Sequence, residues 1–237
     1  MELKNSQIFF FKIPKYWAMY YQFMNKAFVF DMDGTLGETV PLAIEAVKAA
    51  YRSLNLPVPS DGDIVSHFGP TEKGLFQMMD EKNCGMLYAE YLKAYAALHG
   101  VYAPKPFSGI EDVLKKISSA GIRLGIVTGK SRDSAKITLD KFGLGGYFSE
   151  VACGGPTGSV KTQRILGLAK KWELSADNIY YVGDSPQDVL DSRKAGAHPL
   201  SAAWSKIADK KALEACSPEM VFDTVDAFGK WLDDFIK

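Results

Sequence analysis

Two aspartates, one residue apart, follow directly on an apolar run early in the chain. In "FVFDMDGT", residues 28–35, the acidic pair is Asp31 and Asp33. If the apolar run is a buried strand, the two carboxylates stand about 7 Å apart along the chain at its end. A cation is the usual reason for tolerating such repulsion, so the pair predicts a metal-dependent site.

Other residues able to do chemistry follow later apolar runs. "IRLGIVT" leads into Thr128 and Gly129, and "NIYYVG" leads into Asp184, with Asp188 four residues further on. Lys161 stands at the start of a helical pattern. These side chains can act together only if the fold brings the ends of their strands to one place.

The order of the predicted elements provides such a place. Strands are predicted at residues 27–31, 122–128, 147–153, 178–184 and 198–203, and helices between them at 110–119, 131–142, 161–172 and 186–195. This alternation predicts an α/β fold with a doubly wound, Rossmann-like parallel sheet and right-handed crossovers. Open sheets of this kind bind ligands beyond the carboxyl ends of their strands, where the residues above are found.

One long interval contains helical patterns alone. They cover residues 38–54, 61–68, 71–79 and 85–99, with Pro-rich breakers between and after them. The economical interpretation is an inserted α-helical cap domain at 38–104. Residues 24–37 and 105–237 then form the α/β core.

The first 23 residues, "MELKNSQIFFFKIPKYWAMYYQF", are rich in aromatic side chains. Their apolar run is too short for a membrane span and a poor signal-peptide core. We expect a leader or extension, either disordered or packed on the surface or against another subunit.

Composition narrows the class of protein. The chain has 28 basic and 28 acidic residues, which argues against a general electrostatic grip on nucleic acid or on an anionic membrane. Its three cysteines, Cys84, Cys153 and Cys216, are widely spaced and include no C-x-x-C pair. We therefore expect reduced thiols in a cytoplasmic protein.

The motifs "DMDGT", "TGK", "SVKTQ" and "GDSPQD" occur in an order that resembles the haloacid dehalogenase-like superfamily, in its phosphatase branch. The chain is most similar to phosphoglycolate-phosphatase-like members with a helical cap, over about residues 26–236. The resemblance implies that Asp31 is the nucleophile and forms an aspartyl-phosphate. It implies that Asp33 first protonates the leaving oxygen and then activates water.

The resemblance also assigns the remaining positions. Mg²⁺ is expected on the Asp31 carboxylate, the Asp33 carbonyl and Asp184. Thr128, the backbone N–H of Gly129 and Lys161 are expected to bind phosphoryl oxygens, and Asp188 to orient its neighbours. Family members usually follow this lysine with proline, whereas Thr162 follows Lys161 here, so Lys130 is a rival for the same role.

The cap leaves several alternatives open. Glu38 either faces the substrate from the cap hinge or is an acid in the first turn of a helix, where acids are favourable. His67 and Lys73 are candidate specificity residues or ordinary solvated side chains. The role of the cap in selecting the substrate is therefore expected, but its residues are not identified.

The sequence thus predicts a magnesium-dependent phosphatase of a small phosphorylated metabolite, with phosphoglycolate as the first candidate. A phosphohexose mutase of the beta-phosphoglucomutase type shares every core residue, and pyrophosphate is an alternative substrate. A regulatory or binding protein on the same fold is the non-enzymatic alternative. A monomer or homodimer is expected, without nucleic-acid or membrane partners.

Overall fold

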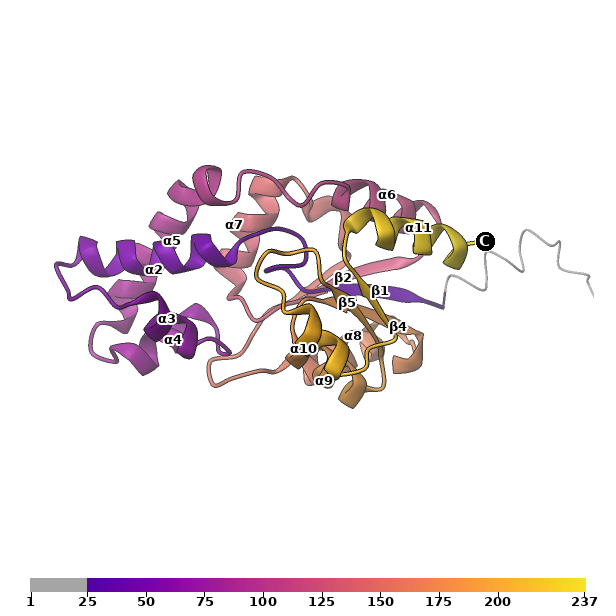
Figure 1. Ribbon diagram of the computed structural model, residues 1–237. Coiled ribbons are helices and arrows are strands. Elements are labelled where there is room, and N and C mark those ends of the chain that lie inside the picture. Colours follow the sequence, from indigo (N-terminus) through magenta and orange to yellow (C-terminus); the bar gives the residue numbers. More distant parts are fainter. Residues whose placement is uncertain (1–24) are drawn as a thin grey trace, which may run out of the picture.

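A computed structural model describes residues 25–237 of the chain (Figure 1). Its centre is a six-stranded parallel sheet with the strand order β3-β2-β1-β4-β5-β6. The strands are β1 (Ala27–Phe30), β2 (Arg123–Val127), β3 (Glu150–Ala152), β4 (Ile179–Gly183), β5 (His198–Ala202) and β6 (Met220–Phe222). The chain winds outward from β1 in one direction and from β4 in the other. The doubly wound parallel sheet predicted from the sequence is confirmed.

Strand β1 shows how the sheet supplies both hydrophobic layers. Phe28 and Phe30 join the cluster that includes side chains of α6 (Ile110–Ser119), α7 (Arg132–Phe142) and α11 (Val225–Phe235). Ala27 and Val29 join the cluster formed with α8 (Lys161–Trp172) and α9 (Pro186–Ala195). Successive side chains of a strand point to opposite faces, and all four are fully buried. Such burial on both faces is typical of a parallel sheet covered by helices.

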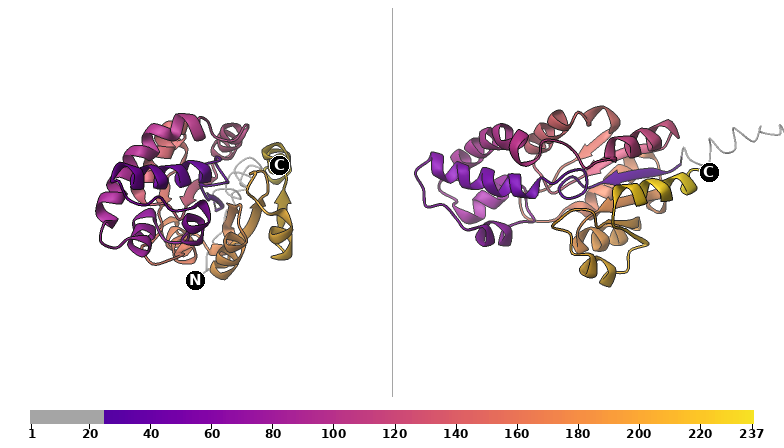
Figure 2. Two further views of the ribbon diagram at one scale, coloured as in Figure 1. Left: turned by 60° about the vertical axis from the view of Figure 1, so that its left-hand side comes forward. Right: turned by 45° about the horizontal axis from the view of Figure 1, so that its top comes forward.

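Four helices between β1 and α6 lie together at one end of the molecule, as Figures 1 and 2 show. They are α2 (Val40–Ser53), α3 (Asp61–Ser66), α4 (Glu72–Met79) and α5 (Cys84–Tyr102). Helix α5 packs along α7, where the hydroxyls of Tyr95 and Thr138 are 2.8 Å apart. The two connections to the core meet, because the N–H of Phe107 donates to the carbonyl of Leu36 at 3.0 Å. The insert is thus held against the core at its hinges and along one helix.

Several elements differ from those predicted. The strand expected over 147–153 begins only at Glu150, because a 3-10 turn, η1 (Gly145–Tyr147), occupies its predicted start. The helices α10 (Lys210–Ala215) and α11 and the strand β6 were missed. A three-residue edge strand is too short to show a period.

None of the helices in residues 25–237 has both the length and the apolar character needed to cross a bilayer. The leader prediction lies outside the described residues.

Candidate active site

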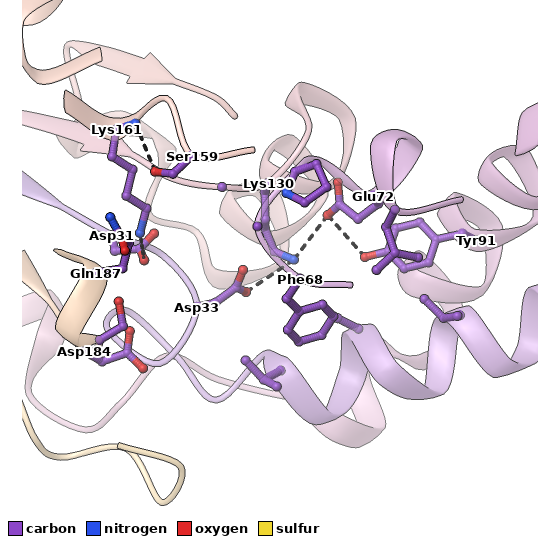
Figure 3. Close-up of a pocket in the computed structure, with 18 residues that line it drawn as sticks. Asp31, Asp33, Phe68, Glu72, Tyr91, Lys130, Ser159, Lys161, Asp184 and Gln187 are labelled. Atoms are coloured by element: carbon purple, nitrogen blue, oxygen red, sulfur yellow. Dashed lines mark hydrogen bonds and ion pairs between the residues drawn. The ribbon is translucent and has the colours of Figure 1, made fainter. Parts of the chain in front are cut away.

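The carboxyl ends of β1, β2 and β4 border a cavity of about 600 Å³ beneath the helical insert. It lies at the point where the strand order reverses, which is the ligand-binding position of such sheets. Figure 3 shows Asp31 and Asp184 at one end of it, Glu72 and Tyr91 at the other, and Asp33 and Lys130 between them. The cavity lining also includes Gly129 and Lys161.

Asp31 is held from two sides. The N–H of Met32 donates to its Oδ1 at 2.7 Å, and Lys161 Nζ donates to its Oδ2 at 2.6 Å. Burial raises the pKa of Asp31 to about 6, and the nearby charges of Asp188 and Asp33 act in the same direction, while Lys161 opposes them. Additional positive charge at this point would therefore favour its ionised form.

Lys161 is positioned by Asp188. Its Nζ lies 2.5 Å from Asp188 Oδ1, which also accepts from the hydroxyl of Tyr181 at 3.1 Å. Asp188 Oδ2 accepts from the backbone N–H and hydroxyl of Ser185, the reciprocal cap that starts α9. Both oxygens of Asp188 are thus engaged, which suits a residue that orients Lys161.

Asp33 contacts a different lysine. Lys130 Nζ is 3.3 Å from its Oδ1, and the hydroxyl of Thr39, in the first connection to the insert, donates to the same oxygen. The structure therefore places Lys161 on Asp31 and Lys130 on Asp33. Thr39 was not singled out in the sequence, because its contact depends on the path of the hinge.

The site contains an oxygen-rich cluster suited to a hard cation. One carboxylate oxygen from each of Asp31, Asp184 and Asp188 lies within 4.8 Å of the others. Burial raises the pKa of Asp184 well above its usual range, and Asp188 and Asp31 add to the effect. Carboxylate oxygens are the ligands that Mg²⁺ prefers in proteins. The donor set therefore fits the ion.

The close approach of the β1 loop to Asp184 requires a glycine. Gly34 has φ +71°, and a Cβ there would lie 1.9 Å from Asp184 Oδ2. Both the left-handed backbone and the contact exclude a side chain. The glycine of the "DMDGT" motif thus lets the loop pass beside this carboxylate.

The β2 end contributes backbone and a buried hydroxyl. Thr128 is 1% exposed, and its Oγ1 accepts from the N–H of Lys130 at 3.3 Å. Ser131, and not Thr128, caps α7, since its hydroxyl accepts from the N–H of Ser134. Gly129 lines the cavity, whereas Thr128 is not among the described residues that do so. Its proposed contact with phosphoryl oxygens stays a prediction.

Glu38 lies in the first connection to the insert and contacts the core. Its carboxylate accepts from the hydroxyl of Ser205 at 3.1 Å and from the N–H of Lys206 at 3.1 Å, in the segment after β5. It is not among the cavity-lining residues of the described chain. The assignment of Glu38 to substrate binding stays a prediction. In the structure the residue precedes the N-cap Thr39 of α2, outside the first turn of that helix, and it joins the hinge to the core. His67 is partly buried and Lys73 is exposed on the insert, and neither of them lines the cavity.

Glu72 was missed from the sequence. It begins α4 after the N-cap Thr71, a place where an acid ordinarily stabilises the helix dipole in solvent. In the fold it is 9% exposed and lines the cavity. Nothing local in the sequence signals that burial.

Comparison with known proteins finds one matching family and several relatives. The family model for haloacid dehalogenase-like hydrolase matches residues 28–202. A phosphoglycolate phosphatase of Xanthomonas campestris is 30% identical over 186 residues, which are 76% of this chain and 83% of that protein. Pyrophosphatase PpaX of Oceanobacillus iheyensis is 22% identical over 202 residues, 84% of this chain and 93% of that protein. A solved haloacid dehalogenase-like family hydrolase of Streptococcus pneumoniae superposes with a TM-score of 0.71 at 21% identity, covering 88% of this chain and 99% of its own.

Proposed function

We propose, because the chain belongs to the haloacid dehalogenase-like hydrolase family, that it is a magnesium-dependent phosphatase acting on a small phosphomonoester. The family resemblance drawn from the four motifs is confirmed, and the phosphatase class expected from the sequence agrees with the names of the relatives. The observation that carries the proposal is the position of Lys161 Nζ, 2.6 Å from Asp31 and 2.5 Å from Asp188, beside Asp184 at the sheet edge.

In this proposal the reaction has two displacement steps. An oxygen of Asp31 forms a bond to phosphorus while the ester P–O bond breaks, and Asp33 gives its proton to the departing alkoxide. Asp33 then takes a proton from water as the water oxygen attacks phosphorus. The Asp31–phosphorus bond breaks and phosphate leaves.

The remaining residues neutralise negative charge and orient the phosphoryl group. Lys161 balances the charge of Asp31 and of the phosphoryl oxygens, held in place by Asp188. The N–H of Gly129 and the hydroxyl of Thr128 are proposed to donate to the phosphoryl oxygens. Asp31, Asp184 and the carbonyl of Asp33 would hold Mg²⁺. When bound, the ion supplies positive charge that offsets the repulsion between carboxylate and phosphate.

The helical insert, residues 38–104, is proposed to act as a cap over the cavity. Val40, Ala43 and Val47 of α2 and Leu75 of α4 line the cavity opposite the carboxylates. A cap of this kind excludes water while the phosphoenzyme exists. The connections near 37–40 and 103–107 would be its hinges, because they are the two places where the chain passes between insert and core.

The names of the relatives suggest two compounds to test first. The Xanthomonas campestris relative is named a phosphoglycolate phosphatase. The Oceanobacillus iheyensis relative is named a pyrophosphatase. Pyrophosphate is therefore the second candidate substrate.

The test combines a substrate panel with a trapped intermediate. Phosphate release from small phosphomonoesters and pyrophosphate is measured with Mg²⁺ and with excess chelator, and turnover is expected only with Mg²⁺. Asp33→Asn should slow turnover by roughly 10²–10⁴-fold, because it removes the proton-transfer group. With p-nitrophenyl phosphate, whose leaving group needs little protonation, that variant should accumulate a phosphoryl adduct on the peptide containing Asp31. Full turnover in chelator, or an adduct on another residue, would contradict the proposal.

A further inference from the structure

A buried carboxylate from the insert stands in the part of the cavity away from the proposed chemistry. Glu72 Oε2 accepts from the N–H of Ser131 at 2.8 Å, and Oε1 accepts from the hydroxyl of Ser134 at 2.5 Å. The hydroxyl of Tyr91 donates to Oε1 at 3.3 Å, and Lys130 Nζ is 3.5 Å from the same oxygen. Burial would raise the pKa of Glu72, but the charge of Lys130 and these hydrogen bonds outweigh it and lower the pKa. Glu72 is therefore an anion inside the cavity.

The two lysines that line the cavity are already paired with carboxylates. Lys161 contacts Asp31 and Asp188, and Lys130 contacts Asp33 and Glu72. The described lining residues include no other lysine or arginine. A second anionic group on a substrate would therefore meet no unpaired cation in the described lining, and it would have to displace Glu72 from Lys130.

The geometry of the proposed reaction determines where the leaving group lies. Its oxygen must be near Asp33, and Figure 3 shows that Lys130, Phe68, Glu72 and then Tyr91 follow on the side away from Asp31. The surrounding wall is apolar, formed by the α2 side chains at 40, 43 and 47 together with Leu75. Like charges repel strongly where water is scarce. A carboxylate on the leaving group would be brought toward that of Glu72.

We propose that Glu72 is a specificity-determining residue that disfavours substrates with a second negative charge and favours phosphomonoesters with a neutral or cationic leaving group. This inference rests on the proposed phosphatase function, since it assumes that phosphate binds at Asp31 and Lys161. It ranks phosphoglycolate and pyrophosphate, the two compounds suggested by the names of the relatives, below neutral and cationic esters. A buried like charge is a recognised means of rejecting competing ligands. The alternative is that Glu72 only fastens the cap to Ser131 and Ser134.

The experiment compares three two-carbon phosphate esters of nearly the same size. Phosphoethanolamine carries an ammonium group, 2-hydroxyethyl phosphate a hydroxyl and phosphoglycolate a carboxylate. Their inhibition constants are measured against hydrolysis of p-nitrophenyl phosphate with Mg²⁺, so that none of them needs to be turned over. For the parent protein the expected order of affinity is ammonium, then hydroxyl, then carboxylate. Tighter binding of the carboxylate than of the hydroxyl compound would overturn the inference without any variant.

Glu72→Gln removes the charge while keeping the size of the side chain. It should strengthen binding of the carboxylate and weaken binding of the ammonium compound, changing their affinity ratio by about tenfold or more. Loss of a purely structural contact would shift all three constants in the same direction. Glu72→Asp keeps the charge and should keep the parent's order. The control Glu81→Gln removes an exposed carboxylate that does not line the cavity.

The outcomes separate the two proposals. An affinity ratio that is unchanged in Glu72→Gln, with p-nitrophenyl phosphate still hydrolysed, would overturn the inference and leave the phosphatase function standing. Absence of hydrolysis by the parent with Mg²⁺ would overturn the proposed function and the inference with it.

Discussion

Replacing Lys161 with methionine removes the cation that separates two buried carboxylates. In the folded protein its Nζ lies 2.6 Å from Asp31 Oδ2 and 2.5 Å from Asp188 Oδ1. The side chains of the three residues are 13%, 9% and 2% exposed, in the order Lys161, Asp31, Asp188, so water screens them little. Methionine fills most of the same volume but leaves Asp31 facing Asp188 without a positive charge.

Removing one member of a buried ion pair costs about 3–5 kcal/mol, because the remaining charge stays desolvated. For a protein of this size that corresponds to a fall in Tm of roughly 6–20 °C. The loss should depend on pH. Burial already raises the pKa of Asp31 to about 6, and without Lys161 it rises further. The folded state then binds that proton more tightly than the unfolded chain, so the destabilisation is largest at neutral pH and shrinks on acidification.

Urea unfolding in chelator measures the effect on the free energy of unfolding, first at neutral and then at mildly acidic pH. The control Lys170→Met changes an exposed lysine on the same helix and should stay within about 0.5 kcal/mol of the parent. Adding Asp188→Asn to Lys161→Met should recover part of the loss, with a coupling energy of about 0.5–3 kcal/mol. A destabilisation below about 1 kcal/mol, or one that grows as the pH falls, would refute this account of the site.

Three further outcomes follow from the same carboxylates. Asp184→Asn should weaken Mg²⁺ affinity and phosphatase activity together, and calorimetric titration showing undiminished Mg²⁺ affinity would count against its role. Gly34→Ala should lower kcat/KM by about 10²-fold by displacing Asp184, whereas Gly167→Ala, where a Cβ meets nothing within 4 Å, should leave kcat/KM at the parent value. In metal-free protein, Asp31→Asn should become more stable relative to the parent as pH rises through the raised pKa of about 6, by up to about 3 kcal/mol, because ionised Asp31 costs more in the folded state. Urea unfolding that shows no such trend would contradict this assignment.

Local sequence was enough to predict most of the core. The helices expected at 110–119, 161–172 and 186–195 have those bounds in the structure. The apolar stripe of the first, which includes Ile110, Leu114 and Ile117, is fully buried. Of the missed elements, α10 and β6 are only six and three residues long, too short to show a clear period. Helix α11 carries an apolar stripe of Val225, Phe228 and Leu232 after the N-cap Thr224, so a local signal for it was present in the sequence.

The carboxylate cluster could also be inferred before the fold was known. Asp31 and Asp184 each follow an apolar strand, and parallel strands present their carboxyl ends at one edge of a sheet. Topology alone therefore brings them together. The apolar residues before each aspartate and the rule for parallel strands are together enough to predict that the two carboxylates lie close to one another.

Which partner each side chain meets was decided only by the tertiary structure. The sequence left Lys161 and Lys130 as rivals, and the structure places one on Asp31 and the other between Asp33 and Glu72. Glu72 contacts Ser131, 59 residues further along the chain, because the insert docks on α7. Helix periodicity and capping depend on residues a few positions apart, whereas such contacts depend on how two separately formed bodies pack. Local sequence therefore determined the positions of most core elements, and long-range packing determined the charges that surround the proposed substrate.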